Sequence, residues 1–232
     1  MSALSTIFSG PAFTIPLTLA LYWASLRVER RYPRMNSLLL ASIALVFALH
    51  LLHIPYAHYR AGGDLFLYLL GPATVALGVP MYHQGAKLKG SLKLILTVVL
   101  AGSVVGMITA GGVAWLLGAS RQVVMSAIPK SVTTPIAIQV SSELHGNPAI
   151  TAAMVLVTGL LGAVIGPGVL RLSRIQHDHA VGCAMGTSSH AIGTATLLRS
   201  SEIQGSVSSL AMAAAGVMTS VLAMLLTLLW RL

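Results

Sequence analysis

The sequence predicts an all-α, polytopic membrane protein in which whole helices alternate with broken or re-entrant ones. Only 8% of the 232 residues are charged and 56% are hydrophobic, whereas about 25% of a soluble domain is charged. Several apolar runs reach the roughly 20 residues that a helix needs to cross a bilayer. The apolar segments between these runs are interrupted by prolines or glycines.

Four apolar runs are expected to form whole helices. In chain order they are residues 35–52, which is slightly short for a full crossing, 92–117, 148–170 and 207–230. Within the last three runs the only charge is Lys93. No soluble domain remains outside the apolar segments, so we expect residues 1–232 to form a single membrane domain.

The other four apolar segments contain helix breakers. They are residues 2–26 (Pro11, Pro16), 65–82 (Pro72, Pro80), 123–144 (Pro129, Pro135) and 180–198 (Gly182, Gly186, Gly193). A simple kink explains any one of them, because proline removes a backbone donor. In lipid, broken backbone survives only where it is buried in protein or lines a watery cavity. The regular alternation of four breaks therefore favours a transporter-like architecture.

The two halves of the chain, residues 1–117 and 118–232, are expected to be inverted repeats. Landmark residues recur at one constant separation, namely Pro33 with Pro148, Gly71 with Gly186, Gly78 with Gly193, Gly90 with Gly205 and Trp115 with Trp230. Positive charge alternates between equivalent loops, since residues 27–34 carry four arginines and residues 143–148 carry no Lys or Arg. By the positive-inside rule, equivalent loops then lie on opposite sides of the membrane.

The same rule fixes an expected orientation. Loops 27–34, 87–93 and 171–179 are expected to be cytoplasmic and loop 143–148 external. All loops fit this orientation only if the first element of each half enters and leaves the membrane on the same side. These elements are residues 2–26 and 123–144. Both elements are therefore predicted to be re-entrant hairpins.

The first polar island is the segment 129–135, whose candidate binding residues are Lys130, Ser131, Thr133 and Thr134. A cation in the hydrocarbon region costs at least about 2.5–3.5 kcal/mol, so it is rarely kept there without a role. A lysine that snorkels to the headgroups is the alternative interpretation. The hydroxyls and the flanking prolines favour a binding tip at which Lys130 and backbone amides meet an anion.

The second polar island is the segment 186–194, which supplies the candidates Ser188, Ser189, His190 and Thr194. The equivalent segment in the first half is mostly apolar, so this island indicates the working half. Its histidine could hydrogen-bond a substrate or carry a coupled proton. The alternative is a hydrogen bond between helices. We predict that both islands are walls of one site for a small organic anion near the bilayer midplane.

Several other functions are disfavoured. The single cysteine, Cys183, excludes a disulfide framework and Cys-based metal sites. No cofactor or metal site is expected. A nucleic-acid-binding face is not expected either, because the basic residues lie in short loops. An intramembrane hydrolase would need a nucleophile elbow and an acid to orient the histidine. Neither is present, so we expect no catalytic residue and no enzyme.

Three stretches, residues 70–82, 129–137 and 186–195, closely resemble the LrgB/CidB family of bacterial membrane proteins, first described as antiholin-like. The resemblance spans essentially the whole chain and extends to the plastid glycolate/glycerate translocator. It implies a multi-pass protein of the bacterial inner (plasma) membrane. It also implies a carrier of small monocarboxylates of the glycolate, glycerate, pyruvate and acetate class, working by alternating access.

The resemblance implies an alternative function as well. In that alternative the protein is an antiholin-like regulator of holin-type pores, murein hydrolase activity and lysis. Because the resemblance covers the LrgB-like part alone, we expect a separate small LrgA/CidA-like membrane protein as a candidate partner. A homodimer is a further candidate assembly.

Overall fold

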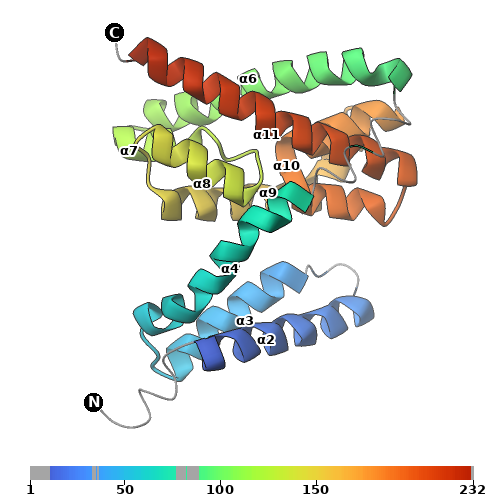
Figure 1. Cartoon of the computed structure of the whole chain (residues 1–232). Helices are drawn as coiled ribbons and strands as arrows, with labels where there is room; N and C mark the ends of the chain where they lie inside the picture. The colour runs from blue at the N-terminus through green and yellow to red at the C-terminus, as the bar shows by residue number, and fades with distance from the viewer. Residues whose placement is uncertain (1–10, 33–34, 36, 77–81, 83–88, 231–232) are drawn as a thin grey trace. The chain divides into compact units, whose positions relative to one another are not determined.

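A computed structural model describes residues 11–32, 35, 37–76, 82 and 89–230. Every regular element in these ranges is a helix (Figure 1). The predicted all-α class is therefore confirmed for the described part of the chain.

The chain divides into two compact units at Ala73–Thr74. The smaller unit holds α2 (Pro11–Arg31), α3 (Ser37–Leu51) and most of α4 (Tyr56–Ala76). The larger unit holds, in order, η1 (Lys89–Ser91), α6 (Leu92–Leu116), α7 (Arg121–Ala127), α8 (Thr134–Glu143), α9 (Pro148–Leu172), α10 (Asp178–Leu198) and α11 (Glu202–Trp230). Helix α6, assigned by sequence to the first repeat, packs against α7, α10 and α11. The inverted repeat with its boundary after residue 117 remains a sequence-based prediction.

In the smaller unit, α2 and α4 are joined by side-chain hydrogen bonds. The Thr18 hydroxyl lies 3.1 Å from the Tyr59 hydroxyl, and Thr14 Oγ1 donates to the Tyr59 carbonyl at 3.5 Å. Helix α2 is continuous through Pro16. The predicted hairpin is therefore wrong for residues 11–26, while residues 2–10 lie outside the described part. A proline this close to a helix start removes one backbone bond, and α2 continues past it.

Helix α4 gives a second correction. Pro72 was predicted to break a helix, but α4 continues through it to Ala76. Proline costs the helix one hydrogen bond and crowds the preceding turn, which bends a helix without having to end it. The other predicted breaker of this segment, Pro80, lies outside the described residues.

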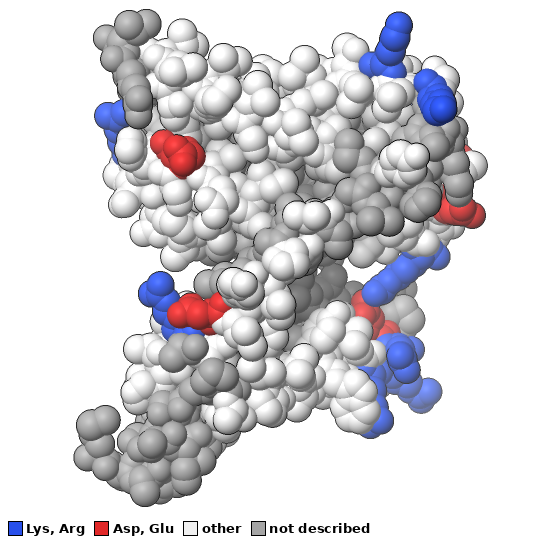
Figure 2. Space-filling model, in the orientation of Figure 1, with Lys and Arg blue, Asp and Glu red and all other residues white. Residues whose placement is uncertain are grey.

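Among the described helices, three are long and apolar enough to cross a membrane, namely Lys89–Leu116, Pro148–Leu172 and Glu202–Leu229. These are the three clear spans that the sequence predicts. The shorter α3 has 15 residues, or about 22 Å at 1.5 Å per residue, which is less than the hydrocarbon core of about 30 Å. On the face in Figure 2, charged atoms of the larger unit lie toward its two ends.

Helices α7 and α8 form a helical hairpin, which we call hairpin A (residues 121–143). The Thr151 hydroxyl, on α9, bonds to both arms: it lies 3.0 Å from the Ser126 carbonyl and 2.7 Å from the Ser141 hydroxyl. The arms therefore lie side by side. The chain reverses in a turn at 128–133, and Pro135 lies in the first turn of α8, where a missing N–H costs nothing.

Helix α10 is also two antiparallel arms, which we call hairpin B (residues 178–198). Its backbone leaves the helical region at His190, with φ 39° and ψ −134°. A Cβ added to Gly193 would lie 3.4 Å from the Met185 carbonyl oxygen. Residues eight apart in a straight helix are separated by about 12 Å, so the chain must double back.

Contacts with α11 trace the reversal of hairpin B. Asp178 accepts a hydrogen bond from Gln204 at 2.8 Å, and a Cβ on Gly186 would lie 2.9 Å from the Ala211 methyl group. The returning arm retraces this path, because the Thr194 hydroxyl lies 2.8 Å from the Ser208 hydroxyl. The first arm therefore advances along α11, and the second comes back.

The two hairpins point at each other from opposite ends of α6. Hairpin A meets the C-terminal half of α6, where Ile128 lies beside Gly111, and its turn reaches Gly106. Hairpin B approaches from the N-terminal half and reaches Gly102 with Thr187. Since α6 is long and apolar enough to cross a membrane, both turns lie deep between its ends.

Candidate functional site

The turn of hairpin A places a cation in a cavity. Lys130 is half-buried, and its ammonium donates to the neighbouring Ser131 hydroxyl at 3.4 Å. Both residues line a cavity of about 560 Å³, which we call the Lys130 cavity. Its walls come from α6 (Leu94, Ile95, Val98, Gly102, Gly106, Thr109), from hairpin B (His179, Ala180, Cys183, Ala184, Thr187, Ser188) and from the preceding loop (Ile175, His177). No acidic residue lines it in the described part of the chain.

The start of α8 offers unused hydrogen-bonding groups. Thr133 occupies the N-cap position of α8 with an extended backbone, yet its hydroxyl makes no capping bond. This hydroxyl is buried and has no hydrogen-bond partner in the described part of the chain. An N-cap hydroxyl normally accepts a bond from the first helical turn. Here the hydroxyl and the first-turn amides remain without a side-chain cap, beside the turn that carries Lys130.

Hairpin B contributes one predicted residue directly to this cavity. Ser188 lines the cavity, and its hydroxyl donates to the Ala184 carbonyl at 2.7 Å and lies 3.0 Å from the Ser189 hydroxyl. The structure thus brings Lys130, Ser131 and Ser188 together around one space. Thr133 is buried and Thr134, the first residue of α8, is half-buried, and both lie outside the cavity lining.

His190 takes a different place from the one predicted. Its ring is 3% exposed, and its Nε2 lies 3.0 Å from the Val155 carbonyl of α9. Gly159 leaves room for this ring, because a Cβ there would lie 2.9 Å from Nε2. His190 is close enough to Lys130 to interact electrostatically, yet it does not line the Lys130 cavity.

The remaining polar residues of hairpin B also face neighbouring helices. Ser189 is 1% exposed and packs against Gly162 of α9, while the Thr194 hydroxyl bonds Ser208 of α11. The sequence correctly marks the second polar island as irregular backbone. Most of its polar side chains, however, hold the hairpin to α9 and α11.

The glycines predicted to break this segment have a different function. Gly186 lies against the Ser208 carbonyl of α11, and a Cβ on Gly193 would lie 2.5 Å from the Ser189 Cβ. Both glycines are helical, and the backbone irregularity is at His190 between them. Because glycine has no side chain, both positions allow neighbouring atoms to pack closely against the backbone.

Two residues of the site region were not singled out from the sequence. Ser103 on α6 has a buried hydroxyl without a partner in the described part of the chain, and it lines a small void beside the turn of hairpin A. Thr187 lines both this void and the Lys130 cavity. A hydroxyl within the glycine-rich stretch of an apolar span was the available signal for Ser103.

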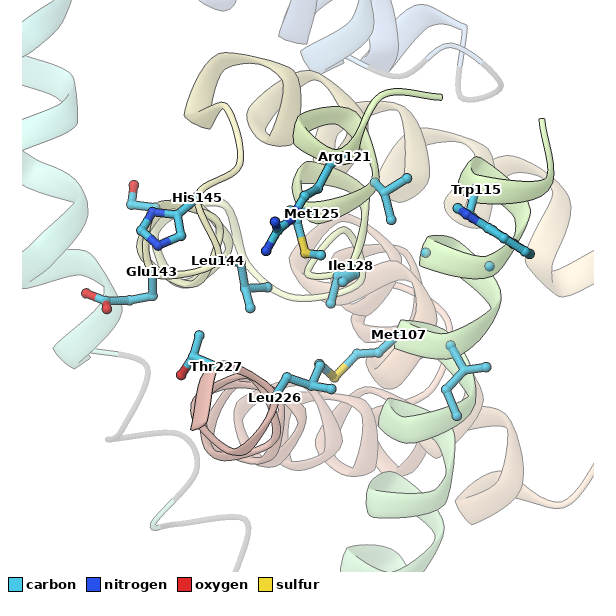
Figure 3. A pocket seen from close by; sticks show the side chains of 15 residues that line it. Met107, Trp115, Arg121, Met125, Ile128, Glu143, Leu144, His145, Leu226 and Thr227 are labelled. Atoms are coloured by element: carbon cyan, nitrogen blue, oxygen red, sulfur yellow. The ribbon is translucent and has the colours of Figure 1, made fainter. Parts of the chain in front are cut away.

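A second cavity lies at the other end of hairpin A. It has a volume of about 530 Å³ and is largely apolar, and we call it the Arg121 cavity. Figure 3 shows Arg121 and Met125 on one wall, Glu143 and His145 at one side, and Met107 and Leu226 on the wall opposite Met125.

The geometry defines a pair of opposed helical hairpins with an anion-compatible turn between them. One cation, several hydroxyls and the N-terminus of a helix can together hold a small carboxylate. A metal is a poorer fit, because the described residues contain no group of three His, Cys, Asp or Glu side chains that could bind one.

Comparison with known proteins gives the family. The chain belongs to the LrgB-like family, whose model matches residues 18–229. It is 40% identical over 205 residues to the uncharacterized protein YwbG of Bacillus subtilis, covering 88% of this chain and 91% of that relative. It is 34% identical over 218 residues to the holin-like protein CidB of Staphylococcus epidermidis, covering 93% and 95% respectively. No solved structure matches it.

Proposed function

We propose that this LrgB-family protein carries small monocarboxylates across the bacterial inner membrane by alternating access. The observation that carries the proposal is the turn of hairpin A, where Lys130 enters a cavity that Ser188 of the opposed hairpin also lines. Discontinuous helices that meet near the midplane are typical of secondary transporters. A regulator of other proteins would not need such a site.

The binding mode follows from the groups at the turn. The carboxylate would lie between the Lys130 ammonium and the start of α8, with the Thr133 hydroxyl as a further partner. The cavity is within the usual range of ligand sites, about 300–1,000 Å³. A small acid would fill only its polar end, and water would occupy the rest.

The proposal includes no chemical change of the anion. Release on the opposite side requires the two hairpins to move. Their movement would close the cavity through which the anion entered and open a path from the bound anion to the other side, as in carriers with broken helices. His190 holds hairpin B to α9 in the present state through the Val155 carbonyl, so it would act on binding only indirectly.

A small LrgA/CidA-like partner or a second copy of the chain would assemble around this unit.

The second candidate function is antiholin-like regulation of holin-type pores and lysis. The name of the staphylococcal relatives, holin-like protein CidB, favours it. In that case the chain would change the timing of lysis through a partner, and the cavity would be an inherited feature.

Uptake by purified protein in liposomes distinguishes the two functions. Radiolabelled glycolate, glycerate, pyruvate and acetate are offered with and without a pH gradient. Carriage predicts saturable uptake of at least one acid, recovered unchanged inside. If no acid in this panel enters faster than in protein-free liposomes, while co-expression with a holin changes the time of lysis, the regulatory function stands instead.

A further inference from the structure

Two cavities approach the same helix from opposite ends. The Lys130 cavity touches α6 from Leu94 to Thr109, and the Arg121 cavity touches it from Met107 to Trp115. At 1.5 Å per residue, Leu94 and Trp115 are about 32 Å apart along the axis, close to the roughly 30 Å of the hydrocarbon core. If α6 crosses the membrane, the cavities therefore face opposite surfaces.

A constriction separates the two cavities. A void of about 10 Å³ lies between them, and this is at the lower limit for holding one water molecule. The void shares Met107 and Ile128 with the Arg121 cavity. It shares Ser131 and Thr187 with the Lys130 cavity. The three spaces thus follow one another along α6, and each shares wall residues with the next.

Polar groups line all three spaces. The buried Ser103 hydroxyl lines the void and has no partner in the described part of the chain. The polar and charged groups of the Arg121 cavity come from Arg121, Ser142, Glu143, His145 and Thr227, so one cation and one carboxylate lie in its wall. A hydroxyl buried without a hydrogen bond costs free energy. A group passing through the constriction would give Ser103 a transient partner.

We infer that the Arg121 cavity is the second vestibule of the transport path and that Met107 and Ile128 form the closed gate between this vestibule and the anion site. This inference rests on the proposed function and adds the route to it. Methionine suits a gate, because three rotatable bonds let its thioether repack at low cost. A lipid chain filling the Arg121 cavity is the competing occupant.

Thiol labelling in cell membranes tests the route without any transport measurement. Single cysteines replace Gly112 in the Arg121 cavity and Ser188 in the Lys130 cavity, each in a Cys183→Ala background. Gly112 has no atom within 4 Å of an added Cβ, so Gly112→Cys fits without a clash. Gly168 of α9 is equally open, is exposed and lines neither cavity, so Gly168→Cys is the matched control.

The expected result is labelling from opposite sides. A membrane-impermeant thiosulfonate should modify Gly112→Cys from one face of the membrane and Ser188→Cys from the other, with Gly168→Cys unreactive in lipid. Total thiol after denaturation normalises each signal. Reaction of both cavity thiols from the same face would overturn the inference, and so would an unreactive Gly112→Cys, which is the result expected of a lipid-filled cavity.

Widening the constriction tests the gate. Met107→Ala and, separately, Ile128→Ala should make Ser188→Cys reactive from both faces. Retained sidedness in both folded variants would contradict the gate. The labelling experiment tests the route and the uptake assay tests the proposed function, so either one can give a negative result without the other. Opposite-sided labelling without uptake would refute monocarboxylate carriage but keep the route, whereas uptake with same-sided labelling would do the reverse.

Discussion

The two hairpins of the larger unit are similar in form but differ in what their turns do. Hairpin A turns through a proline-bounded loop and exposes Lys130 to a cavity. Hairpin B turns at one strained residue and holds His190 and Ser189 against α9. Under the proposed function the first turn would bind the anion, whereas the second mainly packs against α9. Polarity alone therefore does not identify a binding residue in a broken helix, since a polar side chain can instead secure the break.

We expect the largest effect from a substitution that disrupts the packing of hairpin B against α11. Gly186→Ala places a methyl group against the Ser208 carbonyl and 2.9 Å from the Ala211 methyl group. The first of these neighbours is backbone and cannot move away, so the substitution should cost about 1–3 kcal/mol or more. Thermal unfolding in detergent should show a clear drop in Tm.

Gly168→Ala is the control for this substitution. Its Cβ meets nothing within 4 Å, and alanine is the better helix former by up to about 1 kcal/mol. Its Tm should be unchanged or slightly higher. Equal losses in both variants would mean that hairpin B does not approach α11 as described.

A pair of threonines sharpens the comparison between binding and packing. Thr133→Val removes a hydroxyl without a protein partner in the described residues, so stability should hold while KM for the anion rises about five- to tenfold, the equivalent of roughly 1–1.5 kcal/mol. Thr151→Val removes a hydroxyl that joins both arms of hairpin A, and should instead lower the free energy of unfolding by about 1–3 kcal/mol.

The KM of Thr133→Val is measured by uptake into liposomes, and the stability of Thr151→Val by thermal unfolding. A Thr133→Val protein with unchanged KM would remove Thr133 from the anion site. A Thr151→Val protein with unchanged stability would contradict the pairing of the two arms.

The smallest effect concerns the strained turn of hairpin B. At φ 39° and ψ −134°, glycine is favoured over any residue with a Cβ. Both His190→Gly and His190→Ala lose the Val155 contact, but the glycine variant should be more stable by about 1 kcal/mol. Ala195, on the exposed face of the returning arm, should show the reverse order when changed to glycine. If His190→Ala matches or exceeds His190→Gly in Tm, the turn is not strained at this residue.

The sequence was sufficient for the features that depend on local composition. The length and apolarity of α6, α9 and α11 predicted the three candidate spans, and Pro129 with Pro135 located the turn of hairpin A. Pro16 and Pro72 were overinterpreted, because a helix can absorb one proline by losing a single bond.

Other features depend on contacts that a single sequence does not show. The reversal of hairpin B rests on the backbone of His190. Its φ of 39° and ψ of −134° lie outside the left-handed helical region that histidine adopts more often than most residues, so the residue type did not indicate the turn. The nearby glycines drew the prediction instead. That the Thr133 hydroxyl finds no partner among the described residues depends on how α8 is packed. The placement of Ser188 in the cavity and of His190 outside it depends on which side of the turn faces α9.

One substitution tests most directly whether Lys130 binds the carboxylate of a transported monocarboxylate, as we propose. Lys130→Met keeps much of the apolar stem and removes the charge, while Lys89→Met removes an exposed lysine that lines neither cavity. Concentration-dependent uptake is measured for both variants and the parent protein in liposomes. We expect a KM at least about tenfold higher for Lys130→Met, because a charged hydrogen bond is lost, and an unchanged KM for Lys89→Met. Equal KM and rate in all three proteins would contradict the claim and leave Lys130 as a lysine that only extends toward the headgroups.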